Sequence, residues 1–131
     1  MSESVIAVRK ITQVSVKVTD VKRAASFYTR LLGLPLLFSQ SNMALLDCGG
    51  IRLLLGVPEN AQFDHPSSTI YFQVDDLFEA HRKLEDQGVE FLGKPHKVAE
   101  FGGYAVWMAF FRDPDGNVQA LTSEIPVASG S

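Results

Sequence analysis

The sequence has little cysteine, no basic cluster and no long apolar run. A single cysteine, Cys48, in 131 residues excludes an internal disulfide and a cysteine zinc cluster, and it favours a reducing, cytoplasmic compartment. The 12 Lys and Arg are outnumbered by 15 Asp and Glu, so we expect neither a nucleic-acid partner nor an anionic membrane surface. The longest apolar stretches, LLGLPLLF and IRLLLGV, are too short and too interrupted to cross a bilayer. The start, MSESVIAVRK, has no signal-peptide pattern.

The composition is that of a globular protein. Hydrophobic residues make up 46% of the chain and charged residues 21%. Disordered chains are typically less hydrophobic and more highly charged, so we expect a folded protein. A chain of this length is expected to form one domain over residues 1–131 and to bury about two-thirds of its unfolded surface.

One pattern occurs twice, in ITQVSVKVTDVKRAASFYTRLLG (11–33) and in STIYFQVDDLFEAHRKLEDQG (68–88). Each copy begins with apolar residues at every second position, which indicates a strand with one packed face. Asp20 and Asp76 follow these strands and suit helix N-caps. Apolar residues at helical spacing come next, and a glycine ends each copy, as at many helix C-termini.

Three further strand candidates follow each predicted helix. They are LPLLFSQ, NMALLDCG and IRLLLGVP in the first half, and VEFLGKPH, AVWMAFF and NVQALTSE in the second. Each half therefore reads β-α-β-β-β, and we place the modules at about residues 10–58 and 68–124 with a linker, ENAQFDHPSS, at 59–68. The predicted class is α+β, with the two modules forming a curved mixed sheet around a shared cavity.

The alternation predicts which side chains line that cavity. One helix can cover one face of a sheet, so the opposite face of each module remains bare. If the Val14 face lies under the first helix, the bare face carries the residues of opposite parity. The inward set from the opening strands is Gln13, Ser15, Thr69 and Tyr71. The register that matches the two halves adds Leu53 and Ala120 from the closing strands, with Arg52 on the opposite side.

The last long strand alternates between two aromatic sets. Trp107 and Phe111 share one side, while Phe110 and Met108 share the other. One set belongs to the core and the other to the cavity, and we take Trp107 as the candidate for ligand contact.

The duplicated motifs VSVKVTDVKRAASFYTRLLGL, FQVDDLFEAHRKLEDQGV and FFRDPDGNVQAL resemble those of the glyoxalase/bleomycin resistance protein/dioxygenase superfamily. This family is also called the vicinal oxygen chelate fold, and the resemblance covers residues 10–124. It implies two βαβββ modules and, in the metal-dependent members, a divalent ion held by four inward side chains, two from each module. The DPDGN motif is interpreted as a structural turn.

The resemblance places the four metal-ligand positions on Gln13, Leu53, Thr69 and Ala120. Leu and Ala have no donor atom, and a neutral amide and a hydroxyl are weak ligands that bring no charge. The sequence therefore predicts that the usual metal centre is absent and that the protein needs no cofactor. A divalent metal is expected only if the protein is an enzyme with atypical ligands.

Among the histidines, His96 is the weak candidate for chemistry. It follows Pro95, and with Glu100 or Asp64 it could hold an ion or serve in acid–base catalysis, since imidazole titrates near neutral pH. The alternative is a structural role in an irregular strand or loop.

Three functions remain open at this point. The preferred one is a metal-free protein that binds a small, partly apolar organic molecule through Gln13, Ser15, Leu53, Thr69, Tyr71, Trp107 and Ala120. The alternatives are a metal-dependent lyase, isomerase or dioxygenase of the same superfamily, and a structural module with a collapsed cavity. Bare sheet faces and edges also predict a homodimer.

Overall fold

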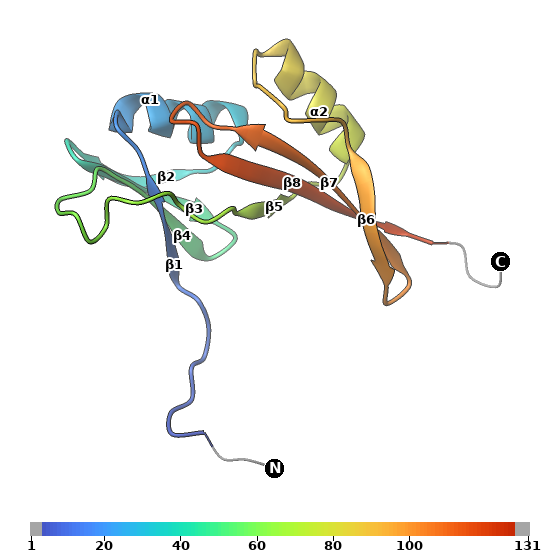
Figure 1. Cartoon of the computed structure of the whole chain (residues 1–131), viewed down its shortest axis with the longest axis horizontal. Coiled ribbons are helices and arrows are strands. Elements are labelled where there is room, and N and C mark those ends of the chain that lie inside the picture. Colours follow the sequence, from blue (N-terminus) through green and yellow to red (C-terminus); the bar gives the residue numbers. More distant parts are fainter. Residues whose placement is uncertain (1–3, 128–131) are drawn as a thin grey trace.

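The computed structural model describes residues 4–127 and contains two four-stranded sheets with strand orders β1-β4-β3-β2 and β5-β8-β7-β6 (Figure 1). Module 1 consists of β1 (Gln13–Lys17), α1 (Val21–Ser26), the π-helix η1 (Phe27–Leu31), β2 (Leu36–Gln40), β3 (Met43–Cys48) and β4 (Ile51–Gly56). Module 2 consists of β5 (Tyr71–Gln73), α2 (Leu77–Asp86), β6 (His96–Phe101), β7 (Tyr104–Arg112) and β8 (Val118–Pro126). The predicted α+β class and the paired βαβββ modules are confirmed.

Both helices begin at the predicted aspartates. The Asp20 carboxylate accepts a hydrogen bond from the backbone N–H of Arg23 at 3.1 Å, and the Asp76 carboxylate accepts one from Glu79 at 3.1 Å. Each cap satisfies one of the N–H groups that the first helical turn leaves without a partner. The two modules therefore start their helices by the same local chemistry.

The helices then differ. The first is α-helical for six residues and continues as a π-helix from Phe27 to Leu31, whereas α2 is regular over ten residues. A π-helix is a wider turn that shifts the side chains that follow it. In this protein the segment carries Tyr28, whose side chain is completely buried.

One strand lies later than the sequence predicts. We expected a strand over VEFLGKPH (89–96), but Phe91 forms only an isolated bridge with Phe111, and β6 begins at His96. Pro95 has no N–H to donate to a ladder, which explains why regular pairing starts after it.

The modules share one hydrophobic core on the helix side of both sheets. Its fully buried members include Val16, Ala24, Tyr28, Leu46, Leu53, Leu55 and Phe111. In Figure 1, α1 and α2 lie on the same upper side of the two sheets. The faces turned away from the helices are therefore the ones that remain open in a single chain.

Tyr28 joins module 1 to module 2 by a buried polar network. Its hydroxyl donates to Asp113 Oδ2 at 2.8 Å and accepts from Gln119 Nε2 at 3.2 Å. Gln119 Oε1 in turn accepts from the backbone N–H of Ile70 at 2.7 Å. Burial, followed by the neighbouring Asp113 carboxylate, raises the pKa of Tyr28 far above its usual value. The phenol therefore stays protonated and can donate to Asp113.

The DPDGN turn (113–117) has the structural role that the sequence predicts. Asp113 Oδ1 accepts from the backbone N–H groups of Asp115 and Asn117, both at 2.9 Å. The Asn117 amide donates across the modules to the Lys17 carbonyl at 2.8 Å. The turn thus closes the β7–β8 hairpin and ties it to β1.

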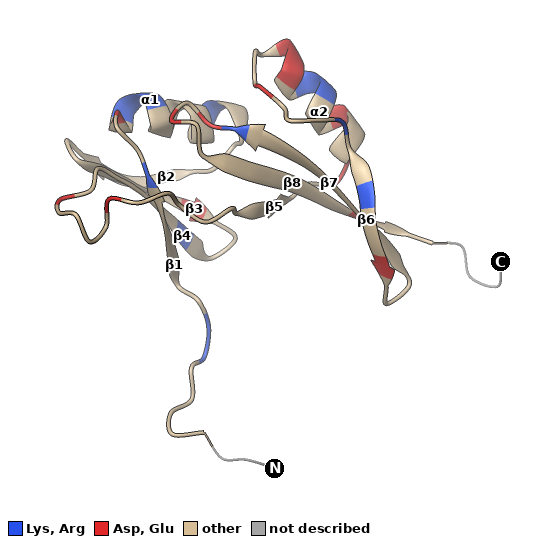
Figure 2. Ribbon diagram, in the orientation of Figure 1, with Lys and Arg blue, Asp and Glu red and all other residues tan. Residues whose placement is uncertain are grey.

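Charged side chains gather on the helices and loops, and the strands carry few of them (Figure 2). Within residues 4–127, no helix has the length and apolar character needed to span a membrane.

Candidate functional site

The open face of module 1 is the face of its sheet turned away from α1. Residues in register on neighbouring strands point to the same side of a sheet, so the pairing defines three rows across this face. The rows are Gln13–Arg52–Asp47, then Ser15–Leu54–Leu45–Phe38, then Lys17–Gly56–Met43–Gln40. The first row is polar, and the second is apolar except for Ser15.

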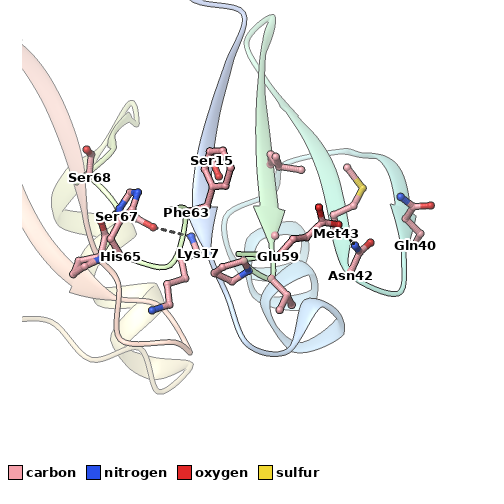
Figure 3. Close-up of a pocket in the computed structure, with 15 residues that line it drawn as sticks. Ser15, Lys17, Gln40, Asn42, Met43, Glu59, Phe63, His65, Ser67 and Ser68 are labelled. Atoms are coloured by element: carbon pink, nitrogen blue, oxygen red, sulfur yellow. Dashed lines mark hydrogen bonds between the residues drawn. The ribbon is translucent and has the colours of Figure 1, made fainter. Parts of the chain in front are cut away.

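A cavity of about 560 Å³ lies over the second and third rows. Its floor includes Ser15, Lys17, Met43 and Leu54, and its side wall consists of Val57, Pro58 and the linker (Figure 3). Every residue that lines it lies between Ser15 and Ser68. Within one chain the cavity therefore has walls from module 1 and the linker, where the sequence predicted walls from both modules.

Two contacts from Lys17 hold the linker beside the cavity. The Lys17 backbone N–H donates to Ser67 Oγ at 2.7 Å, and its ammonium lies 2.6 Å from Asp64 Oδ1. On the other side, Asn42 Nδ2 donates to Glu59 Oε1 at 3.2 Å. Figure 3 shows Phe63 and His65 of the linker on the β1 side of the cavity and Met43 across from them.

The predicted cavity position of Leu53 is wrong. Leu53 is in register with Val14, so both lie on the helix side, and Leu53 is 1% exposed in the core. The register inferred for the closing strand was displaced by one residue, and a displacement of one reverses the face of every side chain.

Because of the same displacement, the sequence placed Arg52 on the side away from the cavity, whereas it lies beside Gln13 on the open face. Arg52 Nε donates to Gln13 Oε1 at 3.0 Å, and both side chains are exposed. No local signal in the sequence marks Arg52, because the register of β1 on β4 joins residues that are 39 apart in the chain. Of the predicted cavity residues in module 1, Ser15 lines the cavity and Gln13 lies one row beyond it.

Thr69, Tyr71 and Ala120 belong to module 2 and lie outside the lining of this cavity. Tyr71 is in register with Ala120, which is in register with Phe110, and the Tyr71 and Phe110 rings meet edge to face at 6.2 Å. Tyr71 is 54% exposed, whereas Ala120 is buried in the row. Thr69 precedes β5 and is half-buried. These residues form the open face of module 2.

His96 stacks on Phe110 at 6.2 Å on the same open face. Its Nδ1 lies 3.1 Å from the carbonyl oxygen of Lys94, and its side chain is exposed. Glu100, the carboxylate considered as its partner, pairs with Lys97. A catalytic role for His96 stays a prediction.

The expected position of Trp107 on the cavity side of its strand is wrong. Trp107 packs against Phe78 of α2, with ring centroids 5.4 Å apart, and adjoins the core. Phe110 and Met108 are the pair on the open side of β7. The alternation separated the two aromatic sets correctly, but it could not say which set the helix covers.

The donor set around Gln13 does not fit a divalent ion. The position that faces Gln13 holds the permanently charged guanidinium of Arg52, and Gln13 Oε1 already accepts from it. Among the described residues there is no group of three or more His, Cys, Asp or Glu side chains that could hold a metal. Burial and then Asp47 raise the pKa of Cys48, which favours its neutral thiol.

Two four-stranded βαβββ modules, which carry their helices on the same side and share one core, define a protein of the vicinal oxygen chelate type. The family model for the Glyoxalase/Bleomycin resistance protein/Dioxygenase superfamily matches residues 10–121, and the chain belongs to this family.

Similar proteins carry varied names. The chain is 28% identical to the uncharacterized protein YraH of Bacillus subtilis, over 83% of this chain and 94% of that protein. It is 29% identical to Glyoxylase I 4 of Arabidopsis thaliana, over 81% of this chain and 66% of that protein. A solved integron cassette protein from the mobile metagenome of V. cholerae, VCH_CASS1, has a TM-score of 0.75 and 26% identity, covering 92% and 98% of the two chains.

Proposed function

We propose that this protein binds a small, partly apolar organic molecule on the open face of module 1, as a cytoplasmic homodimer and without a metal ion. The observation that carries the proposal is the 560 Å³ cavity between β1, β4 and the linker. Its volume is within the range of small-molecule sites, which usually combine apolar walls with a few polar groups.

The cavity offers both kinds of surface. Met43 and Leu54 supply apolar floor, and Phe63, which is 60% exposed, supplies a flat ring from the linker. Ser15 and Asn42 add hydrogen-bonding groups at the edges. An apolar molecule with one or two polar atoms would find a complementary surface here.

Metal-free binding is supported by the charge beside Gln13. A dication at this place would stand next to the Arg52 guanidinium with no carboxylate or imidazole from the predicted ligand positions to offset its desolvation. The site is therefore better suited to binding than to metal-assisted chemistry.

The homodimer is supported by the aromatic open face of module 2. Phe101 is 67% exposed, Tyr71 is 54% exposed and Tyr104 is 44% exposed, and the pairing puts all three on the side away from α2. A second copy that covers this surface would remove it from water. We propose that the partner's module 2 closes over the cavity of module 1, so that the ligand lies between two chains.

A small-molecule library screened by thermal shift tests the binding function. Molecules that raise the melting temperature of the wild type are expected to lose their effect in Leu54→Gln, because the substitution puts an amide into the apolar floor. Leu92→Gln is the matched control, since Leu92 is 49% exposed and lies outside the cavity lining. The absence of any stabilising molecule, or equal shifts in both variants, would overturn the proposal.

The second candidate is a metal-dependent lyase, isomerase or dioxygenase. The similarity to Glyoxylase I 4 is the observation that favours it. Elemental analysis of the purified protein, with thermal shifts after addition of Ni²⁺, Zn²⁺, Mn²⁺ and Fe²⁺, separates the two functions. Stoichiometric metal bound with Gln13 among its ligands would favour the enzyme.

A further inference from the structure

We infer that the ligand is an organic carboxylate whose negative group binds the Arg52 guanidinium while its apolar part lies over Leu54. This inference rests on the proposed binding function and deepens it. The guanidinium lies beside Gln13, one of the positions that the family resemblance assigns to a metal ligand, so this end of the open face carries a positive charge of the protein's own.

The Arg52 guanidinium uses its Nε in a hydrogen bond, while its two Nη groups remain available within the part of the chain that the structure describes. Its Nε donates to Gln13 Oε1 at 3.0 Å, which holds the guanidinium beside Gln13. Within residues 4–127, neither of its Nη atoms has a hydrogen-bond acceptor or a carboxylate within salt-bridge distance. The two Nη groups together present the fork that binds the two oxygens of a carboxylate.

The acidic side chains near Arg52 and the cavity have partners of their own. Asp47, in register with Arg52 on the same face, accepts instead from the backbone N–H of Gly50 at 3.3 Å. In the linker, Asp64 pairs with Lys17 and Glu59 accepts from Asn42. Of the two cations that the described strands place on this face, Lys17 is paired with Asp64, and Arg52 is the one left for a ligand.

The distance between charge and apolar floor sets the shape of the ligand. Arg52 and Leu54 are two residues apart on one strand, which separates their side chains by roughly 7 Å. A carboxylate at Arg52 would place a ring or a short alkyl chain over Leu54 and toward Met43, where the cavity lies. Arylalkyl carboxylates have this length.

Titration calorimetry with phenylacetate and 3-phenylpropionate, each paired with its primary amide, tests the inference. The wild type is expected to bind a carboxylate about 10-fold more tightly than the amide, an effect of one charge-assisted contact. Arg52→Met should abolish this preference, and Arg52→Lys should keep part of it, because an ammonium has the charge without the fork. Asp47→Asn should strengthen carboxylate binding.

Arg82→Met is the matched control, because Arg82 is an exposed arginine on α2 and pairs with Asp86. It should bind as the wild type does. Amides that bind as tightly as carboxylates, an unchanged preference in Arg52→Met, or no binding of either carboxylate would overturn the inference. Neutral library molecules that still depend on Leu54 would leave the binding function standing in each of these cases.

Two further outcomes also decide against the inference. Tighter binding of phenyl phosphate than of the carboxylates would assign the site to phosphate esters. Sedimentation of Arg52→Met as a monomer, with unchanged carboxylate affinity, would assign Arg52 to the subunit interface.

Discussion

Module 1 and module 2 share a plan and differ in what each does with its two faces. Both have an Asp-capped helix on one face of a four-stranded sheet. On the helix side, Tyr28 of the π-helix in module 1 donates a hydrogen bond to Asp113 of module 2. In module 2, α2 packs on its own sheet through Phe78 and Trp107. On the open side, module 1 carries Arg52 and a cavity, and module 2 carries aromatic rings.

The two faces of a duplicated sheet are under different constraints. The helix sides meet in one core, so a change there must suit both modules at once. Within residues 4–127 the open faces are not packed against each other in such a core, so they can diverge in charge and shape. The duplication is therefore easiest to recognise in the helix caps and core positions. The candidate site consists of open-face residues that differ between the two modules.

The largest effect is expected when the common core is opened. Phe111→Ala removes a ring that is fully buried against Phe27 and Phe91 and should lower the free energy of unfolding by about 3–5 kcal/mol. Phe110→Ala, its neighbour on the open side of β7, should cost clearly less. Urea denaturation of both variants at low protein concentration checks this, and equal losses would contradict the assignment of the two faces.

A smaller loss is expected when only the polar contact between the modules is removed. Tyr28→Phe keeps the ring but leaves the buried Gln119 amide without the hydroxyl it donates to, which should cost about 1–3 kcal/mol. Tyr71→Phe is the control, because Tyr71 is 54% exposed and should change stability by less than about 0.5 kcal/mol. A neutral Tyr28→Phe would show that the network does not hold the modules together.

The same tyrosine should make stability fall in alkali. Burial raises the folded-state pKa of Tyr28, so its stabilising contribution is fully present below the unfolded pKa of about 10 and declines as the pH rises beyond it. Above pH 10 the unfolded chain loses a proton that the folded chain retains. Urea midpoints measured between pH 8 and 11 should fall more steeply for the wild type than for Tyr28→Phe, and parallel slopes would contradict this.

The smallest effect on stability is expected at the linker. Lys17→Ala breaks an ion pair with Asp64 whose side chains are 36% and 56% exposed, so the loss should stay below about 1 kcal/mol. The variant should nevertheless be cut faster by protease within residues 59–68, because the linker keeps the backbone contact through Ser67 but loses the ion pair through Asp64. Lys83→Ala, which breaks the exposed pair with Glu79 on α2, should leave this cleavage rate unchanged.

Much of the fold follows from the sequence because its signals are local. Asp20 and Asp76 mark helix starts by a contact within three residues, and strand alternation needs no distant partner. The candidate site depended instead on register, which is set by pairing between strands far apart in the chain. An error of one residue in β4 exchanged Arg52 for Leu53 and so replaced a cation by a core leucine.

Trp107 and the π-helix show two other limits. The sequence divides β7 into two faces, but the position of α2 decides that Trp107 is covered by Phe78. After the change from α- to π-helix at Phe27, Tyr28 lies against Asp113, which is 85 residues away in the sequence. No sequence pattern near Tyr28 predicts this contact.

The linker that joins the two modules is also a wall of the cavity. Insertions and deletions in such a surface segment are tolerated far better than changes in a sheet. The size and selectivity of this pocket can therefore drift across descendants through loop length alone, while the architecture beneath it is inherited intact.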